Sequence, residues 1–506
     1  MLFSSTHRTK RCLYYGAISA RFRGPGMKDK LRREYKNPPR ITEFKKSFVI
    51  EFPDDEHRPP ILHLQGTHYE MGYAFGILYA EKIKRYLSEF GSPVAAMYGG
   101  WQPGSGEPTL NQMKKGLEVL HSIAEQRTIP VLRDSEPQYW EEIEGTYDAL
   151  QHAGSPLTWN DVVLLANAGE AFWNSEGPQN LCSNFAAWGE ATKDGKLVHG
   201  VNLDYEARGV LQNHISVMVR KPTETGENAV IGLCHNGMLA PYTWINDKGL
   251  GYGELDENTL HYRWPTLPHL WRGMKIAHNA STIEEAYKIV KTTGGSTGHS
   301  LLISQANRHG TYAADIEISG TEHAIRHENP GLPNVIFQTN IFKCVPGYPG
   351  YEGEENLFEG QMKYIEKILP QRPDHFIDQS TTWEDVKTLA TFLEKVQCPR
   401  YGRYEEFFKE NHGRIDLEQA IRIQSDPALT IDRMKGRQPL TGKVPHLFGI
   451  EREIVLEYLW SVYSVVLIPE EGTLWIAVGE IPAQRGPFWY VNLNEQLEMM
   501  KKYENN

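Results

Sequence analysis

The chain has 506 residues, of which 40% are hydrophobic, 11% aromatic and 23% charged, and its formal net charge at pH 7 is −11. This composition is typical of a globular protein long enough for more than one core, and it excludes collagen-like and largely disordered chains. The acidic balance argues against nucleic acid as a partner, because phosphate binding depends on clustered Lys and Arg. No stretch reaches the roughly 18 consecutive apolar residues of a membrane span.

The charge is distributed unevenly along the chain. Residues 1–40 contain 11 Lys or Arg and only 2 acidic residues. We predict that residues 1–45 form a basic segment outside the folded body: a disordered arm, a targeting segment, or residues upstream of a true start at Met27. Its apolar run from Leu13 to Ala20 is too short and too weakly hydrophobic for a secretory signal. We therefore expect a cytoplasmic protein.

The cysteines are odd in number and widely scattered, at Cys12, Cys182, Cys234, Cys344 and Cys398. This spacing does not fit a disulfide framework, so reduced thiols in a reducing compartment are expected. The chain contains no CxxC pair and no His-Glu-x-x-His motif. We therefore predict no metal site from the sequence.

The segment 46–181 is predicted to be mainly helical. Residues 61–87 read as a short strand, a turn and a helix, with Thr67 and Glu70 in a capping box. Gly72 and Gly76 lie four positions apart on this helix and permit close packing against a neighbour. Further helices are expected within 108–126, 137–150 and 158–173.

Sheet-forming patterns begin close to Cys182. Short apolar or alternating runs between 184 and 247, broken by turns, predict consecutive antiparallel strands. A helix capped by Ser281 with Glu284 follows, then strands to about residue 340, a helical block over 382–425, and a hairpin over 461–479. This alternation predicts an α+β layer architecture.

Cys182 stands where the helical pattern gives way to strands. A free cysteine is most often a buried small hydrophobe, and an isolated thiol, with a pKa of about 8.5, is a poor nucleophile at neutral pH. Papain-like and caspase-like signatures are absent, and His199 and His235 are weak candidates for a base. A cysteine can instead be activated as the first residue of a chain, where its own α-amino group is the base.

The stretch 182–205, "CSNFAAWGEATKDGKLVHGVNLDY", resembles the start of the mature subunit in the autoproteolytic acyltransferase and hydrolase family typified by isopenicillin-N acyltransferase. That family belongs to the N-terminal-nucleophile hydrolases and is related to choloylglycine hydrolase. Further matching pieces, spread over about 60–495, occur in family order: "GTHYEMGYAFGILYAEKI", "WINDKGLGYG", "STIEEAYKIV", "NVIFQTNIF", "RYGRYEEFF" and "SVVLIPEEGTLWIAVGEIP". The resemblance implies a four-layer αββα sandwich. It also implies a helical pro-segment, 46–181, that becomes the small subunit, and a catalytic domain, 182–506, that becomes the large one.

The resemblance also implies a set of catalytic roles. Cleavage between Leu181 and Cys182 would make Cys182 the nucleophile and its freed amino group the general base. Asp204 matches the acid that holds that amino group, and Asn340 matches the residue that stabilises the oxyanion. Arg403 matches a late arginine that favours the thiolate, with Arg400 as an alternative.

Other positions carry weaker implications. Trp188, Asn202 and Tyr205 are candidate pocket residues, although aromatic strand residues are more often part of a core. The sequence departs from relatives at Val201, where an arginine is common, and at 254–256, where the bile-salt branch has a second oxyanion asparagine. These departures weaken a bile-salt interpretation.

The expected activity is that of an autoprocessed zymogen, a cysteine amidase or N-acyltransferase that works through a thioester on Cys182. Its substrate would be a small linear amide, with an acyl donor such as acyl-CoA if it transfers rather than hydrolyses, and no cofactor is expected. The alternative, favoured by Val201, is a catalytically silent relative that binds a small molecule. Substrate identity and oligomeric state stay open.

Overall fold

The computed structural model describes residues 30–504 except 34–36, 56, 102–105, 167–181, 206–209, 225, 258–262, 321, 341, 346–398 and 427–460. Within this part of the chain the strands form two sheets. The seven-stranded sheet has the spatial order β1 (Leu31–Arg32), β17 (Phe488–Asn492), β16 (Thr473–Ala477), β15 (Ser461–Ile468), β6 (Gly195–Asp204), β5 (Ser183–Gly189) and β14 (Val335–Thr339). The ten-stranded sheet has the order β13 (Glu322–Arg326), β12 (Gly310–Ser319), β11 (Gly298–Asn307), β10 (Leu250–Glu257), β9 (Thr243–Asn246), β8 (Val230–His235), β7 (Ile215–Pro222), β4 (Ile61–Gly66), β3 (Ser47–Glu51) and β2 (Arg40–Phe44).

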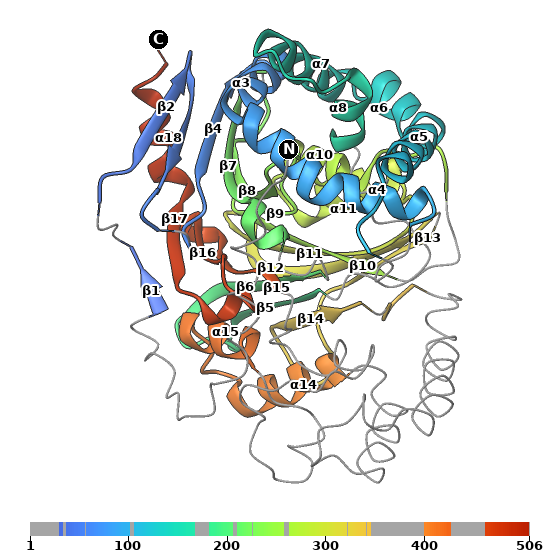
Figure 1. The fold of residues 1–506 in the computed structure, drawn as a ribbon. Coiled ribbons are helices and arrows are strands. Elements are labelled where there is room, and N and C mark those ends of the chain that lie inside the picture. Colours follow the sequence, from blue (N-terminus) through green and yellow to red (C-terminus); the bar gives the residue numbers. More distant parts are fainter. Residues whose placement is uncertain are drawn as a thin grey trace.

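The two sheets pack face to face, with β5 and β6 against β10, β11 and β12. Helices cover the outer face of each sheet (Figure 1). On the ten-stranded sheet and around it lie α3 (His68–Tyr86), α4 (Ser92–Tyr98), α5 (Leu110–Arg127), α6 (Ile129–Ser135), α7 (Pro137–His152), α8 (Trp159–Ala166), α10 (His269–Asn279) and α11 (Ile283–Thr293). On the seven-stranded sheet lie α14 (Pro399–Asn411) and α15 (Leu417–Gln424), and α18 (Leu493–Lys501) is the last described helix. The predicted α+β class, with two sheets and helices, is confirmed.

The N-terminal segment contributes strands as well as helices. Strand β4 pairs in parallel with β7, and β3 and β2 extend the sheet beyond it. Strands β1 and β2 fall inside 1–45, the segment expected to lie outside the folded body, whereas residues 1–29 are outside the described part. The segment before Cys182 is therefore integral to the larger sheet, and it is less purely helical than the sequence pattern suggested.

The expected helix over the second half of 61–87 is α3, and its capping box is present as predicted. Thr67 accepts a hydrogen bond from the backbone of Glu70, whose side chain accepts one from the backbone of Thr67. A Cβ on Gly72 would lie 2.0 Å from the carbonyl oxygen of Glu142, and one on Gly76 would lie 2.6 Å from the Cβ of Ala149. Glycine at these two positions thus allows α3 to approach α7 at backbone distance.

Two further local predictions can be compared with the structure, and one of them is wrong by one residue. The hairpin of β15 and β16 forms as predicted, with Gly472 in the left-handed region at φ 64°. The cap of α11 is Thr282, which accepts from the backbone of Glu285, so the prediction of Ser281 is wrong by one residue. Two adjacent capping residues precede two adjacent glutamates, and the pattern alone cannot choose between the registers. Of the helical block predicted over 382–425, residues 382–398 lie outside the described part.

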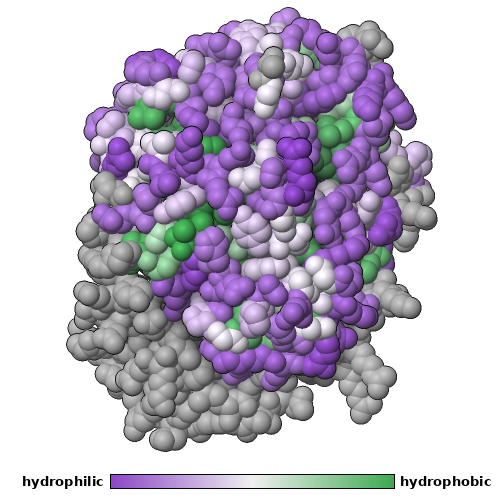
Figure 2. Space-filling view, turned by 180° about the vertical axis from the view of Figure 1, so that it is seen from behind, coloured by the Kyte–Doolittle hydropathy of each residue, from purple (hydrophilic) through white to green (hydrophobic). Residues whose placement is uncertain are grey.

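The described surface is mostly polar, and the described cysteines are free thiols. Figure 2 shows a face on which hydrophilic residues dominate and hydrophobic ones form small separate patches. Among the described helices, none is both long enough and apolar enough to cross a bilayer. Cys182, Cys234 and Cys344, the cysteines of the described part, form no disulfide.

Candidate functional site around Cys182

Strand register places Cys182 in the row of strand ends along one side of the seven-stranded sheet, which is called the Cys182 edge below. Strand β5 begins at Ser183, which pairs with Thr339 of β14 on one side and with Asn202 of β6 on the other. The residue before Ser183 therefore lies beside Asn340 on the β14 side. On the other side β6 ends at Asp204, which pairs with Ser461 of β15. The edge thus carries Asn340, Cys182, Asp204 and Ser461 on four adjacent strands.

The Cys182 side chain is buried, with 2% of its surface exposed. Burial raises the pKa of the thiol well above its usual range, and the carboxylates of Asp204 and Asp256 raise it further. The backbone N–H of Asp204 and the guanidinium of Arg400 act in the opposite direction without reversing the shift. The Cys182 thiol is therefore protonated at neutral pH.

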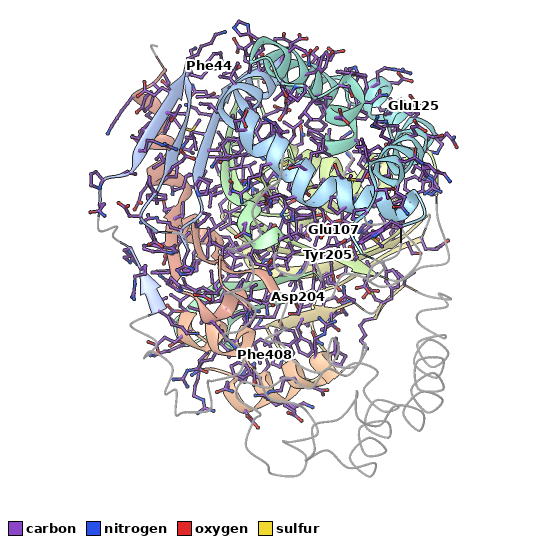
Figure 3. All side chains as sticks on the ribbon, in the orientation of Figure 1. Phe44, Glu107, Glu125, Asp204, Tyr205 and Phe408 are labelled. Carbon is purple, nitrogen blue, oxygen red and sulfur yellow. The ribbon has the colours of Figure 1, made fainter. Side chains whose placement is uncertain are left out.

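Asp204 lies in the interior between the helical layers, next to Tyr205 (Figure 3). It is fully buried, and its Oδ1 accepts a short hydrogen bond from the Ser461 hydroxyl. Gln484 donates to that hydroxyl in turn at 2.8 Å. Burial raises the pKa of Asp204 to about 7, against the opposing effects of Ser461 and Arg400. Its other oxygen, Oδ2, has no hydrogen-bond partner among the described residues.

Arg400, at the start of α14, connects Cys182 with Asn340. Its Nη1 donates to the Cys182 carbonyl oxygen at 2.6 Å, and its Nη2 donates to Asn340 Oδ1 at 2.9 Å. The Asn340 amide nitrogen donates to the Asp256 carbonyl oxygen at 2.6 Å. Asn340 is therefore held at both ends of its amide, next to the cysteine.

Arg403, assigned to the site from the sequence, lies one turn further along α14 and faces elsewhere. Its Nε donates to Asp426 Oδ2 at 2.6 Å, and its Nη1 lies 3.4 Å from Glu406. Arg400, the alternative, is the arginine that contacts Cys182. The motif "RYGRYEEFF" holds both arginines three residues apart, and only the orientation of the helix distinguishes them.

The three candidate pocket residues separate in the structure. Asn202 exchanges hydrogen bonds with Gln424 and so fastens α15 to β6. Trp188 lies at the far end of β5, about 20 Å along the strand from Cys182, in a core cluster between the sheets. Tyr205 follows Asp204 directly and packs edge-on against Phe90. Of the three, only Tyr205 is next to the Asp204 end of the edge.

The remaining parts of the site were not apparent in the sequence. Ser461 and Gln484 lie 257 and 280 positions after Asp204, and no local pattern marks either of them as a partner. Residues 254–256, noted as a departure from relatives, do lie beside the site, because Asp256 accepts from Asn340. Leu181, the other predicted cleavage residue, lies outside the described residues.

A groove of about 560 Å³ lies at the opposite end of the strands. The turns after β9, β11 and β15 line it, including Lys248, Arg308 and Pro469. Because β6 runs away from this end towards Asp204, the groove is separate from the Cys182 edge.

Comparisons with known proteins give distant relatives. No family model matches the chain. An uncharacterized protein of Archaeoglobus fulgidus is 22% identical over 290 residues, which are 54% of this chain and 46% of that protein. A β-alanyl-dopamine/carcinine hydrolase of Drosophila melanogaster is 29% identical over 106 residues, 21% of this chain and 22% of the hydrolase. The matched regions therefore span less than half the length of these curated relatives.

Solved structures align at low scores. A Caenorhabditis elegans ortholog of N-acylethanolamine-hydrolyzing acid amidase is 13% identical, with a TM-score of 0.33, over 57% of this chain and 93% of that chain. Penicillin V acylase from Agrobacterium tumefaciens is 12% identical, with a TM-score of 0.36, over 62% of this chain and 87% of that chain. A variant of conjugated bile acid hydrolase from Clostridium perfringens is 13% identical, with a TM-score of 0.35, over 62% and 93%. The architecture described above rests on the sheets and helices of this chain alone.

Proposed function

We propose that the chain is a cysteine N-terminal-nucleophile amidase that cuts itself between Leu181 and Cys182 and then hydrolyses linear amides. The observation that carries the proposal is the register of β14, β5, β6 and β15, which brings Asn340, Cys182, Asp204 and Ser461 to one edge. The match to a curated hydrolase and the family resemblance of 182–205 support it.

In the proposed maturation, the Cys182 sulfur attacks the Leu181 carbonyl carbon. The bond from that carbon to the Cys182 nitrogen breaks, the thiol proton moves to the departing amine, and a thioester forms. Water then hydrolyses the thioester, which leaves a Leu181 carboxylate, a free thiol and a new α-amino group. The uncut chain is proposed to be an inactive precursor, because its Cys182 thiol is buried, with a raised pKa, and no α-amino group is yet free to act as the base.

In the proposed turnover, the freed amino group accepts the thiol proton, since an α-amino pKa of about 7.7–8.0 suits a base at neutral pH. The thiolate attacks the amide carbonyl, the amine leaves with a proton, and water releases the acid from the thioester. Asp204 is proposed to hold the protonated amino group. Asn340 would donate to the oxyanion, with Arg400 positioning both Asn340 and the Cys182 backbone.

Intact-mass analysis of the purified protein tests this mechanism. Cleavage after residue 181 of 506 would divide the 57.7 kDa chain into pieces of about 21 and 37 kDa. Cys182→Ala should stay uncut and inactive towards an amide screen. Cys234→Ala is the matched control, because Cys234 is also a buried thiol on a strand, and this variant should still divide.

The competing function is a silent binding protein, favoured by the absence of an arginine at Val201. A thiol-reactive acyl probe separates the two. In the enzyme, the probe should label Cys182, the new N-terminal residue, much faster than it labels Cys234. In a binding protein, the probe should label the two cysteines at similar rates. A wild-type chain that stays whole and unlabelled would exclude the amidase mechanism.

A further inference from the structure

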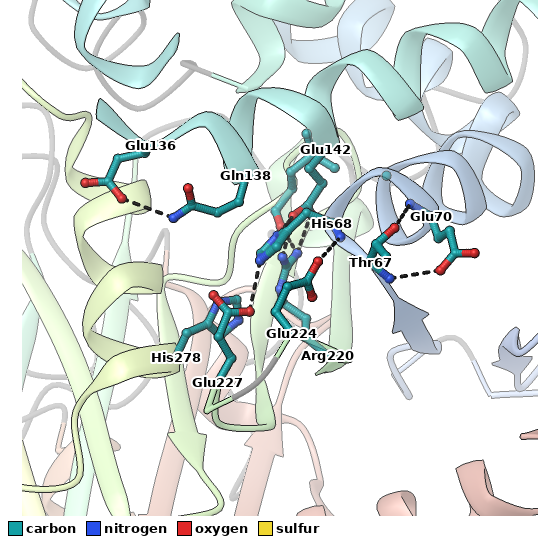
Figure 4. A network of polar contacts seen from close by, with 12 residues as sticks. Thr67, His68, Glu70, Glu136, Gln138, Glu142, Arg220, Glu224, Glu227 and His278 are labelled. Atoms are coloured by element: carbon teal, nitrogen blue, oxygen red, sulfur yellow. Dashed lines mark hydrogen bonds and ion pairs between the residues drawn. The ribbon is translucent and has the colours of Figure 1, made fainter. Parts of the chain in front are cut away.

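A buried polar cluster lies under α3, away from the Cys182 edge. His68, the first residue of α3, meets Glu227 from the loop after β7 and His278 near the end of α10 (Figure 4). One ligand-type atom from each of the three lies within 4.8 Å of the others. Their positions in the sequence, 68, 227 and 278, form no motif, which is why the spacing of His and Cys indicated no metal.

His68 is oriented as metal-bound histidines are. Its Nδ1 lies 3.0 Å from Glu142 Oε2, and its Nε2 faces Glu227 Oε2 at 3.0 Å. Arg220 holds Glu142 through two hydrogen bonds of 2.6 Å. A carboxylate behind one imidazole nitrogen fixes the ring so that the other nitrogen faces the ion, which is the usual support for a histidine ligand.

His278 supplies the observation that the hydrogen-bond network does not explain. Its side chain is fully buried, and neither ring nitrogen has a hydrogen-bond partner among the described residues. Its Nδ1 lies 3.9 Å from Glu227 Oε1, too far for a hydrogen bond. A buried imidazole left in this way loses the free energy of its hydration, and a metal ion would recover it.

We propose that His68 Nε2, the Glu227 carboxylate and a ring nitrogen of His278 bind one divalent cation of the Zn²⁺ class. Two imidazoles and a carboxylate are a donor set that zinc accepts, with water or a second carboxylate oxygen completing four ligands. Ligand atoms on a tetrahedral zinc lie roughly 3.3 Å apart, so small side-chain shifts would suffice. The ion takes the place of the hydrogen between His68 and Glu227, which leaves as a proton.

The charges around the cluster balance such an ion. Glu142, Glu227 and Glu224 supply three carboxylates, and Glu224 accepts from the His68 backbone at 3.1 Å. The Glu224 Oε2 atom is buried and without a hydrogen bond in the described part. Together the three carboxylates match the two charges of the ion and the one charge of Arg220, so the ion would be buried in a neutral set.

The site would join two parts of the fold. His68 precedes the Leu181–Cys182 bond in sequence, and Glu227 and His278 follow it. The ion would therefore tie α3 to the loop after β7 and to α10, whether or not that bond is cut.

The test uses the full chain, stripped with a chelator and dialysed against zinc. We expect one zinc per chain by elemental analysis. Zinc should raise the melting temperature, and magnesium should leave it unchanged. Co²⁺ bound in place of zinc should give a visible absorption band. His278→Gln and Glu227→Gln should each weaken zinc binding at least 100-fold. Less than 0.1 zinc per chain, with an unchanged melting temperature, would overturn the site.

His235→Gln is the matched control, because His235 is also fully buried with neither ring nitrogen hydrogen-bonded in the described part. It should keep one zinc. Glu227 is 12% exposed, so Glu227→Gln keeps the test available if His278→Gln does not fold. Zinc retained by both cluster variants, or lost equally in His235→Gln, would refute the assignment.

Discussion

Two buried aspartates, one in each sheet, are alike at one carboxylate oxygen and differ at the other. Asp204 and Asp315 each accept from a serine hydroxyl, Ser461 and Ser300 respectively. The other oxygen of Asp315 accepts from Arg326 at 2.9 Å, whereas Asp204 Oδ2 has no hydrogen-bond partner among the described residues. A buried carboxylate completed by a cation is a structural group. One that lacks the cation has a place for a positive charge, which the proposed α-ammonium of Cys182 would fill.

The largest effect expected from this comparison is a loss of stability when Asp315 loses its cation partner. Arg326→Met removes the cation from Asp315 and leaves the carboxylate buried, which should cost about 3–5 kcal/mol of unfolding free energy. Urea denaturation of the uncut Cys182→Ala chain measures it. The double variant Arg326→Met with Asp315→Asn should recover much of the loss. A cost below about 1 kcal/mol would mean that the pair is not the structural group described.

Substitution of Asp204, which lacks a cation partner in the described part, should affect activity instead. Asp204→Asn removes the charge that would hold the Cys182 amine as it leaves the Leu181 carbonyl and gains a proton, and that would later hold the ammonium of the cut enzyme. We therefore expect self-cleavage and amide turnover to fall by about 10² or more. In the Cys182→Ala background the same change should not destabilise the fold at pH 7, because asparagine, like the protonated carboxyl, carries no charge. Time-resolved intact mass measures the cleavage rate, and Asp247→Asn, at an exposed strand end, is the control. An Asp204→Asn chain that matures at the wild-type rate would remove Asp204 from the mechanism.

The sequence predicted those parts of the site that local patterns encode. The strand–turn–strand pattern at 182–205 predicts a hairpin with Cys182 and Asp204 at its two ends, and β5 and β6 pair as antiparallel neighbours. The choice between Arg400 and Arg403 depends on how α14 rotates against β14, which is a property of packing and not of helical spacing. Ser461 reaches Asp204 through a pairing 257 positions apart, and such long-range register leaves no local signal.

The same limit applies to the N-terminal segment and to the histidine cluster. Helical periodicity and the capping box predicted α3, yet the parallel pairing of β4 with β7 had no marker in the sequence. His68, Glu227 and His278 come from the start of α3, the loop after β7 and the end of α10, and they meet only in the folded chain. Sequence reasoning recovers elements and local caps, and it misses sites assembled across the sheet.

Asp204 should also make the stability of the uncut chain depend on pH. Its pKa is raised by burial from 3.8 to about 7 in the folded chain. A carboxyl whose pKa is higher in the folded state stabilises the fold fully below the unfolded pKa, and this stability is lost as pH rises to the folded pKa. We expect Cys182→Ala to lose roughly 2 kcal/mol between pH 5 and 7 through this group.

Urea titrations at several pH values isolate this contribution. Asp204→Asn in the Cys182→Ala background should flatten the decline by that amount, while all other titrating groups stay the same in both chains. The Asp247→Asn control should leave the decline unchanged. Parallel curves for Cys182→Ala with and without Asp204→Asn would show that Asp204 is already ionised in the folded chain at pH 5.

The smallest expected effect comes from removing the serine hydroxyl that donates to each aspartate. Ser461→Ala deletes one hydrogen bond to Asp204 Oδ1 and leaves Gln484 Nε2 without its acceptor. The loss should be about 1 kcal/mol in stability, and cleavage should slow by about tenfold or less. Ser300→Ala is the matched change at Asp315, and it should cost similar stability without slowing cleavage, because Arg326 still holds that carboxylate. Equal slowing in the two variants would mean that the serine acts through the fold, and slowing confined to Ser461→Ala would place the hydroxyl in the support of Asp204.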